Sequence, residues 1–186
     1  NLKLRLWRGV RDWDSLMDRW LGTQLKDVDA AELEKQVNLY NKTVFLASKG
    51  LPGNPVVPSL KAKVDEFSPV LPVVVNLRNN SLKDRHWSQI HHLIGFAIQG
   101  DDTFSLGKLI EKRVTDFAEQ ITNIATSAVQ ESVLEIMMDK VDRIWKVTEF
   151  EVRNYKDTKD LFIMGDVSEI IANLDESLVT INTVLG

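Results

Sequence analysis

Apolar residues recur every three or four positions along most of this chain, and this spacing is the strongest constraint on its fold. It places the apolar side chains on one face of a helix. The longest such stretch has no glycine or proline between Lys108 and Met164, so we predict one helix over 105–148. From Thr115 to Lys146 that helix would extend roughly 45–50 Å. The sequence therefore predicts a mainly α fold, an elongated multi-helix bundle.

Shorter stretches with the same spacing predict further helices. Asp29 stands three residues before Glu32, which is typical of a helix start, and Gly50 and Pro52 end that helix. The stretch 70–77 would also suit a strand by composition, but the helices before it favour a helix. These predicted helices lie at about 2–21, 29–49, 56–68, 70–79, 82–95 and 166–185.

One segment departs from the helical pattern. Near residues 149–164, two apolar stretches flank a polar one, and the first alternates apolar with polar side chains. This pattern predicts a strand, a turn and a second strand, which together form one small β-hairpin. An isolated hairpin is marginally stable in water, so we expect it to rest on a helix or on a neighbour outside this segment.

Both ends of the sequence favour a piece of a longer protein. The chain begins with Asn1 rather than methionine, and charges interrupt every apolar stretch near that end, so no signal peptide is predicted. The last predicted helix is still apolar at Leu185. A helix that ends in this way indicates a packing partner beyond the sequence.

The composition argues against several classes of partner. The chain has no cysteine, which excludes disulfides, thiolate metal sites and cysteine nucleophiles. Its 23 basic and 27 acidic residues are interspersed and give a net charge of −4, so we predict neither nucleic acid nor a membrane surface as a partner. No apolar run approaches the roughly 20 residues that a membrane-spanning helix needs.

No pattern predicts a catalytic, cofactor or metal site. The histidines, His86, His91 and His92, do not have the spacing of a zinc-binding helix. The stretch from Gly100 to Lys108 has six residues between its glycines, where a phosphate-binding loop has four. Acidic pairs such as Asp101 and Asp102 are more typical of solvent-facing loops. We therefore predict a non-catalytic segment.

The chain has five tryptophans, and two of them share a helix face because Trp13 and Trp20 are seven residues apart. Aromatic residues at helical spacing usually belong to the core. The alternative is a face that docks a partner, because tryptophan is enriched among the residues that anchor interfaces.

Short motifs in the middle of the chain occur in a definite order. Leu71 and Pro72 precede a Leu77-Arg78-Asn79 step, the triplet Arg85-His86-Trp87 follows, and a long helix carries Trp145. This ordered set resembles the linker segment, or N-terminal region 2, of dynein heavy chains over nearly the whole sequence. The stretch 51–61 looks closer to the axonemal, or ciliary, branch of that family than to the cytoplasmic one.

The resemblance implies a very large parent protein, a microtubule motor with a ring of ATPase modules. ATP and Mg²⁺ would bind in that ring, with no cofactor in this segment. The partners would be the ring of the same polypeptide and other dynein heavy, intermediate or light chains, with microtubules reached only through the parent. The expected location is the cytoskeleton of the ciliary axoneme, with the cytoplasm as the alternative.

Within such a parent, the resemblance implies the tail-proximal part of a helical arm that couples changes in the ring to movement of the tail. A mechanical arm needs stiff helices and defined bending points, and Pro69, Pro72 and Gly100 are the candidate hinges. The alternative function is a helical scaffold that docks another subunit through Trp13 and Trp20. We expect Trp87 to fill the core, in which case Trp87→Ala would cost roughly 3–5 kcal/mol.

Overall fold

The computed structural model describes residues 2–186, and these are mainly α-helical with one two-stranded sheet. The predicted fold class, mainly α with a small hairpin, is therefore confirmed. The chain divides into two compact units, Asn1–Ala128 and Val129–Gly186.

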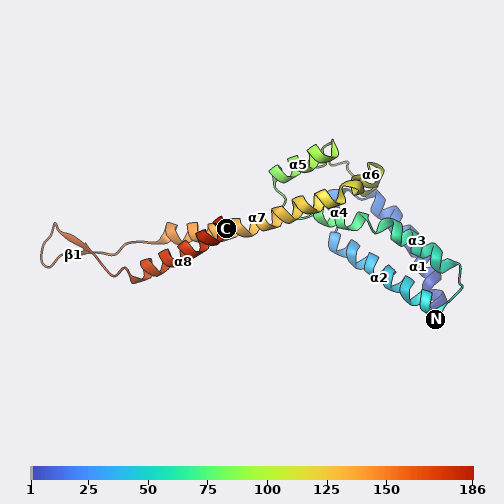
Figure 1. Ribbon diagram of the computed structural model, residues 1–186, viewed down its shortest axis with the longest axis horizontal. Coiled ribbons are helices and arrows are strands. Elements are labelled where there is room, and N and C mark those ends of the chain that lie inside the picture. Colours follow the sequence, from blue (N-terminus) through green and yellow to red (C-terminus); the bar gives the residue numbers. More distant parts are fainter. Residues whose placement is uncertain (1) are drawn as a thin grey trace. The chain divides into compact units, whose positions relative to one another are not determined.

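The first unit is entirely helical apart from its loops (Figure 1). Two short 3-10 turns, η1 (Leu25–Asp27) and η2 (Val114–Phe117), separate longer helices. The unit also contains the start of α7 (Ala118–Val147). Its other helices are α1 (Leu2–Gly22), α2 (Ala30–Gly50), α3 (Val56–Phe67), α4 (Val70–Leu77), α5 (Asp84–Ile94) and α6 (Leu106–Glu111).

Helices α1, α2 and α3 pack against one another around an aromatic cluster. The ring of Trp13 lies at its centre, with its centroid 4.9 Å from that of Tyr40 and 6.0 Å from that of Phe67. Trp20 stacks on Phe67 at 5.5 Å. Burying rings of this size supplies much of the apolar area that holds a helical core together.

The local signal for the start of α2 is confirmed. Asp29 is the residue before the helix, and its carboxylate accepts a hydrogen bond of 3.0 Å from the backbone N–H of Glu32. The side chain thus satisfies one of the backbone donors that every helix leaves unpaired at its first turn. In contrast, α5 begins at Asp84, two residues later than the predicted start at 82.

The prediction of one helix over 105–148 is wrong. The chain forms α6, η2 and α7 instead, because Arg113 adopts a left-handed conformation with φ of 54°. The break allows Leu109, Val114 and Ile121, all fully buried, to reach the same core. In one straight helix, these three side chains would be spread along the helix axis and could not all reach the same core.

The second unit contains the rest of α7, the strands β1 (Val152–Asn154) and β2 (Phe162–Met164), and α8 (Ser168–Leu185). The strands are antiparallel, with Arg153 opposite Ile163, and every side chain in them is exposed. The predicted hairpin near 149–164 is therefore present.

Helices α7 and α8 meet in the second unit through polar contacts. The indole N–H of Trp145 donates to the hydroxyl oxygen of Ser177 at 2.9 Å, and Lys140 pairs with Glu176 at 2.8 Å. Of residues 129–186, all of which the structure describes, only Val141 and Ser177 are buried. The apolar core of this unit is therefore small.

Candidate functional site

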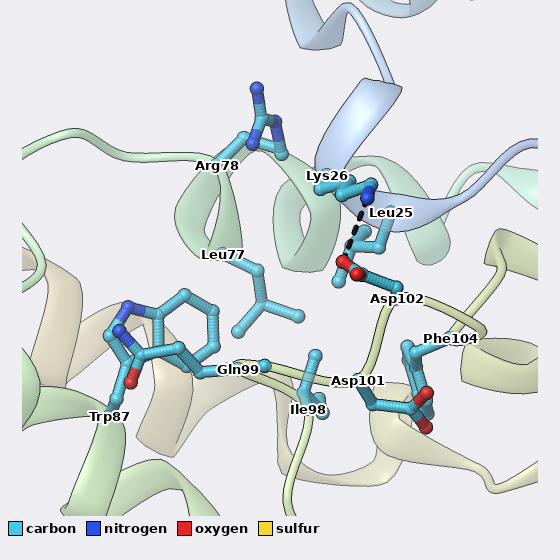
Figure 2. Close-up of a pocket in the computed structure, with 11 residues that line it drawn as sticks. Leu25, Lys26, Leu77, Arg78, Trp87, Ile98, Gln99, Asp101, Asp102 and Phe104 are labelled. Carbon is cyan, nitrogen blue, oxygen red and sulfur yellow. Dashed lines mark hydrogen bonds and ion pairs between the residues drawn. The ribbon is translucent and has the colours of Figure 1, made fainter.

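The structure brings three of the sequence-predicted residues to one pocket in the first unit. Arg78 follows α4 and Trp87 lies in the first turn of α5 (Figure 2). Gly100 belongs to the loop after α5. The pocket has a volume of about 200 Å³. The turn η1 forms another wall with Leu25 and Lys26.

The floor of this pocket is apolar and its rim is charged. Leu77, Ile98 and Phe104 are buried and close the floor. At the rim, the Lys26 ammonium donates to the Asp102 carboxylate at 2.7 Å, and this hydrogen bond raises the pKa of Lys26 (Figure 2). Both partners are exposed, so the pair contributes little free energy, but it joins segments 76 residues apart in sequence.

Backbone hydrogen bonds fix the same two segments more firmly. The N–H of Leu25 donates to the carbonyl oxygen of Phe104 at 2.8 Å, and the N–H of Leu106 donates to that of Thr23 at 3.0 Å. These bonds surround an isolated antiparallel bridge between Gln24 and Ser105. The segment between α1 and α2 is thus locked to the segment that enters α6.

His91 holds the other end of the loop that contains Gly100. Its Nε2 atom accepts the backbone N–H of Ile98 at 3.0 Å and that of Gln99 at 3.1 Å. An imidazole nitrogen accepts only when it carries no proton, so His91 is neutral with its proton on Nδ1. Burial favours the same form by lowering the pKa of His91.

The side chain of Asp101 stabilises the turn within this loop. The Asp101 carboxylate accepts from the hydroxyl of Thr103 at 2.7 Å and from its backbone N–H at 2.8 Å. These two hydrogen bonds hold the pKa of the Asp101 carboxyl below its ordinary value. Gly100 itself has φ of 85°, a left-handed conformation that glycine adopts at no steric cost.

The triplet before the loop has mainly local roles. His86 is buried, and its Nδ1 atom accepts the backbone N–H of Lys83 at 3.0 Å, which helps to begin α5. Arg85 is exposed. Trp87 is half-buried and lies over His91, with 5.8 Å between ring centroids. Trp87 therefore fills the core only in part, because it packs against the core while one side of its ring faces the pocket.

The candidate hinges at 69 and 72 lie at a tight junction between α3 and α4. Ser68 and Pro69 are the only two residues between the helices, and both keep helical backbone angles. Pro72 is the third residue of α4, where a backbone N–H would lack a partner within the helix, so it does not break that helix. Leu71 is half-buried against the core. Movement at Pro69, Pro72 or Gly100 stays a prediction.

The interpretation of Trp13 and Trp20 as core residues is confirmed, and their burial contradicts the alternative of a docking face. Trp13 is 1% exposed and Trp20 is 9% exposed, because both rings lie in the aromatic cluster between α1, α2 and α3. Rings at these depths present almost no surface to a partner while the first unit is folded. The other motif tryptophan, Trp145, belongs to the second unit and bonds to Ser177.

Sequence analysis does not connect the residues at the rim of the pocket. Lys26 carries no motif and Asp102 stands out in the sequence only as part of an acidic pair, and the folded chain brings the two together. His91 holds the same loop without lining the pocket. Over residues 2–186, no group of three or more His, Asp or Glu side chains is arranged to hold a metal ion. In the same residues, no helix has both the length and the apolar character needed to cross a membrane.

Comparison with known proteins identifies the type of chain. A family model described as "Dynein heavy chain, N-terminal region 2" matches residues 1–186. The chain is 38% identical, over 98% of its length, to dynein axonemal heavy chain 6 of Homo sapiens. It is 29% identical, over 95% of its length, to dynein axonemal heavy chain 1 of Rattus norvegicus.

A third relative comes from an alga. Over 96% of its length, the chain is 25% identical to the dynein-1-beta heavy chain of the flagellar inner arm I1 complex of Chlamydomonas reinhardtii. In all three comparisons it covers 4% of the relative's own length. This is a motor heavy-chain segment. The chain belongs to the dynein heavy chain N-terminal region 2 family, and its relatives are axonemal or flagellar, as the motifs predicted.

Proposed function

We propose that this chain is a non-catalytic mechanical linker segment of a ciliary microtubule motor. It couples ATP-driven changes in the ATPase ring of its parent to movement of the tail. The family match over residues 1–186 supports this proposal, because it assigns the whole chain to one region of a dynein heavy chain. The axonemal relatives favour the cytoskeleton of the cilium or flagellum as its location.

The observation that carries the proposal is the construction of the first unit. One continuous core joins α1 through η2, and backbone bonds lock the segment after α1 to the segment before α6. A block tied together in this way resists bending within itself. Force applied at one end is then transmitted through the block. The block is least stiff where its helices are interrupted, at Ser68–Pro69 and at the loop around Gly100, so we expect any bending to occur there.

The proposal assigns chemistry and contacts to the rest of the parent. ATP and Mg²⁺ bind in the ring, and microtubules are contacted by the parent outside this segment. The immediate partners are the ring of the same polypeptide and other dynein heavy, intermediate or light chains. Isothermal titration of the 186-residue chain with ATP and Mg²⁺ should give no heat of binding, and measurable binding would contradict the non-catalytic assignment.

A matched pair of valines tests the mechanical role in the parent motor. Val74 is fully buried in α4, whereas its neighbour Val75 is 38% exposed. Val74→Ala opens a cavity that costs about 2 kcal/mol and softens the core. We expect it to slow microtubule gliding severalfold while ATP hydrolysis continues. Val75→Ala should leave both unchanged.

Hydrogen exchange of the backbone amides in α4 establishes that Val74→Ala loosens the block. If these amides exchange faster in the variant but gliding does not slow, the block does not transmit force and the proposal fails. Paired fluorescent labels across Ser68–Pro69, and across the loop at Gly100, locate the bending point. A label pair whose separation does not change with nucleotide in the parent motor excludes that junction as a hinge.

A further inference from the structure

A groove runs between the first three turns of α1 and the second half of α2, within the first unit. Two adjoining cavities of about 330 and 190 Å³ form it, and both are lined by Arg5, Leu39 and Thr43. We call this feature the α1/α2 groove. It is separate from the pocket at Trp87 and shares no residue with it.

Exposed leucines line the α1/α2 groove. Leu39 is 52% exposed and Leu46 is 43% exposed, although both belong to a well-packed helix. Leu2 faces them from the first turn of α1. Leu39 and Leu46 are seven residues apart, which places them on one side of α2 two turns from each other. That repeat matches the spacing at which an amphipathic helix presents apolar side chains.

The groove also carries cations that the chain does not neutralise. Arg5, Arg8 and Lys42 line it, and among residues 2–186 none of these three has a carboxylate within 4.0 Å. Its one acidic residue, Asp12, is paired with Arg11 at 2.9 Å. This local excess of positive charge occurs in a chain whose net charge is −4.

We propose that the α1/α2 groove binds an acidic amphipathic helix of a partner polypeptide. The apolar row of that helix covers Leu2, Leu39 and Leu46, and its flanking Glu or Asp residues pair with Arg5, Arg8 and Lys42. A wholly acidic, disordered peptide is disfavoured because it would leave the leucines exposed to water. The inference does not depend on the mechanical role, because it rests on residues of α1 and α2 alone.

Three fluorescein-labelled synthetic peptides of equal length test the proposal. The first is a helix with leucines at seven-residue spacing flanked by glutamates, the second has lysines in place of the glutamates, and the third is polyglutamate. Fluorescence anisotropy with the 186-residue chain measures binding. We expect the glutamate–leucine helix to bind at least about tenfold more tightly than either of the others, and more weakly as salt rises.

Charge-reversal variants locate the binding surface. Arg5→Glu combined with Lys42→Glu should weaken binding of the glutamate–leucine helix at least about tenfold. The control combines Arg19→Glu with Lys49→Glu, which makes the same change in net charge on the same two helices outside the groove. It should bind as the unchanged chain does.

A second variant pair tests the apolar part and does not alter charge. Leu39→Ser should weaken binding, whereas Phe45→Ser should not, because Phe45 is similarly exposed on α2 but lies outside the groove. Far-UV circular dichroism establishes that each variant is folded. If the charge reversals unfold the chain, the Leu39 and Phe45 pair alone decides the question.

Three results would overturn the inference. The glutamate–leucine helix could fail to bind. Polyglutamate could bind as tightly, which would indicate recognition of a disordered acidic peptide. Each control could weaken binding as much as its partner variant, which would place the contact elsewhere. Binding of the glutamate–leucine helix would not establish the mechanical role. That role is tested separately by the effect of Val74→Ala on gliding of the parent motor, so the two proposals can fail independently.

Discussion

At the scale of single residues, one imidazole nitrogen determines how firmly the loop at Gly100 is held. His91 accepts the N–H groups of Ile98 and Gln99 only while its Nε2 is unprotonated. Burial lowers the pKa of His91 below its ordinary value of 6.5. The unfolded loop therefore takes up a proton at a higher pH than the folded loop does. Stability of the loop is complete above that ordinary pKa and falls as the pH drops below it.

Hydrogen exchange of the Ile98 and Gln99 amides, corrected for intrinsic rates, measures this dependence between about pH 7.5 and pH 5. We expect their protection to fall toward the acidic end. His91→Phe should lower protection at every pH, because the two donors lose their acceptor at a cost of about 1–2 kcal/mol. His92→Phe is the control, since His92 is exposed. If the protection of these two amides did not change with pH across this range, the role of His91 protonation in loop stability would be contradicted.

Trp13 and Trp87 both look like core residues in the sequence, but they should contribute different amounts to the free energy of unfolding. Trp13 is buried at the centre of the aromatic cluster, whereas Trp87 is half-buried at the pocket. Trp13→Ala should cost roughly 3–5 kcal/mol, and Trp87→Ala about half of that, since less apolar area is lost. Urea unfolding followed by far-UV circular dichroism gives both values. Equal losses would show that the two rings are buried to the same extent.

At the scale of elements, the break before α7 stores a local strain. Arg113 has φ of 54°, and the left-handed region costs a residue with a Cβ atom roughly 1–2 kcal/mol. Arg113→Gly should therefore be more stable than Arg113→Ala by about 1 kcal/mol, because both lose the exposed ion pair with Asp116 but only alanine keeps the strain. Urea midpoints compare the two variants. An alanine variant at least as stable would mean that the turn is not strained.

The elements that the sequence predicted well are those whose signals are local. The face of α1 that carries Leu6 and Trp13 is buried as its spacing indicates, and the cap at Asp29 needs only the next three residues. The break at Arg113 could not be predicted, since neither glycine nor proline marks it and the burial of Val114 is what favours it. The pocket was also hidden, because Lys26 meets Asp102 only after the helices have packed.

At the scale of the whole molecule, the two units differ in how much apolar surface they bury. The first unit has a continuous core, whereas only Val141 and Ser177 are buried in residues 129–186. We expect amides of α8 to exchange faster than those of α2, since opening α8 exposes less apolar surface. Hydrogen exchange with mass spectrometry measures both helices in one experiment. Equal protection would show that the chain opens as a single cooperative block.

The α1/α2 groove shows why a surface is harder to predict than a core. Arg5 and Lys42 look like ordinary exposed cations in the sequence, and Leu39 looks like one more residue of a helical stretch. Their relation becomes visible only when α1 and α2 lie side by side and the missing counter-charges can be checked. Spacing reveals which face of a helix is buried, but the pairing of exposed charges depends on tertiary neighbours.

The bridge between Gln24 and Ser105 delays folding of the chain during its synthesis on the ribosome. Lys26 and Asp102 beside it are 76 residues apart, and a ribosome adds roughly 5–20 residues each second. The early helices therefore wait roughly 4–15 s, after leaving the exit tunnel, for the residues that lock them. During that interval Leu25 has no backbone acceptor from Phe104, and the half-finished core offers apolar surface that a chaperone can shield.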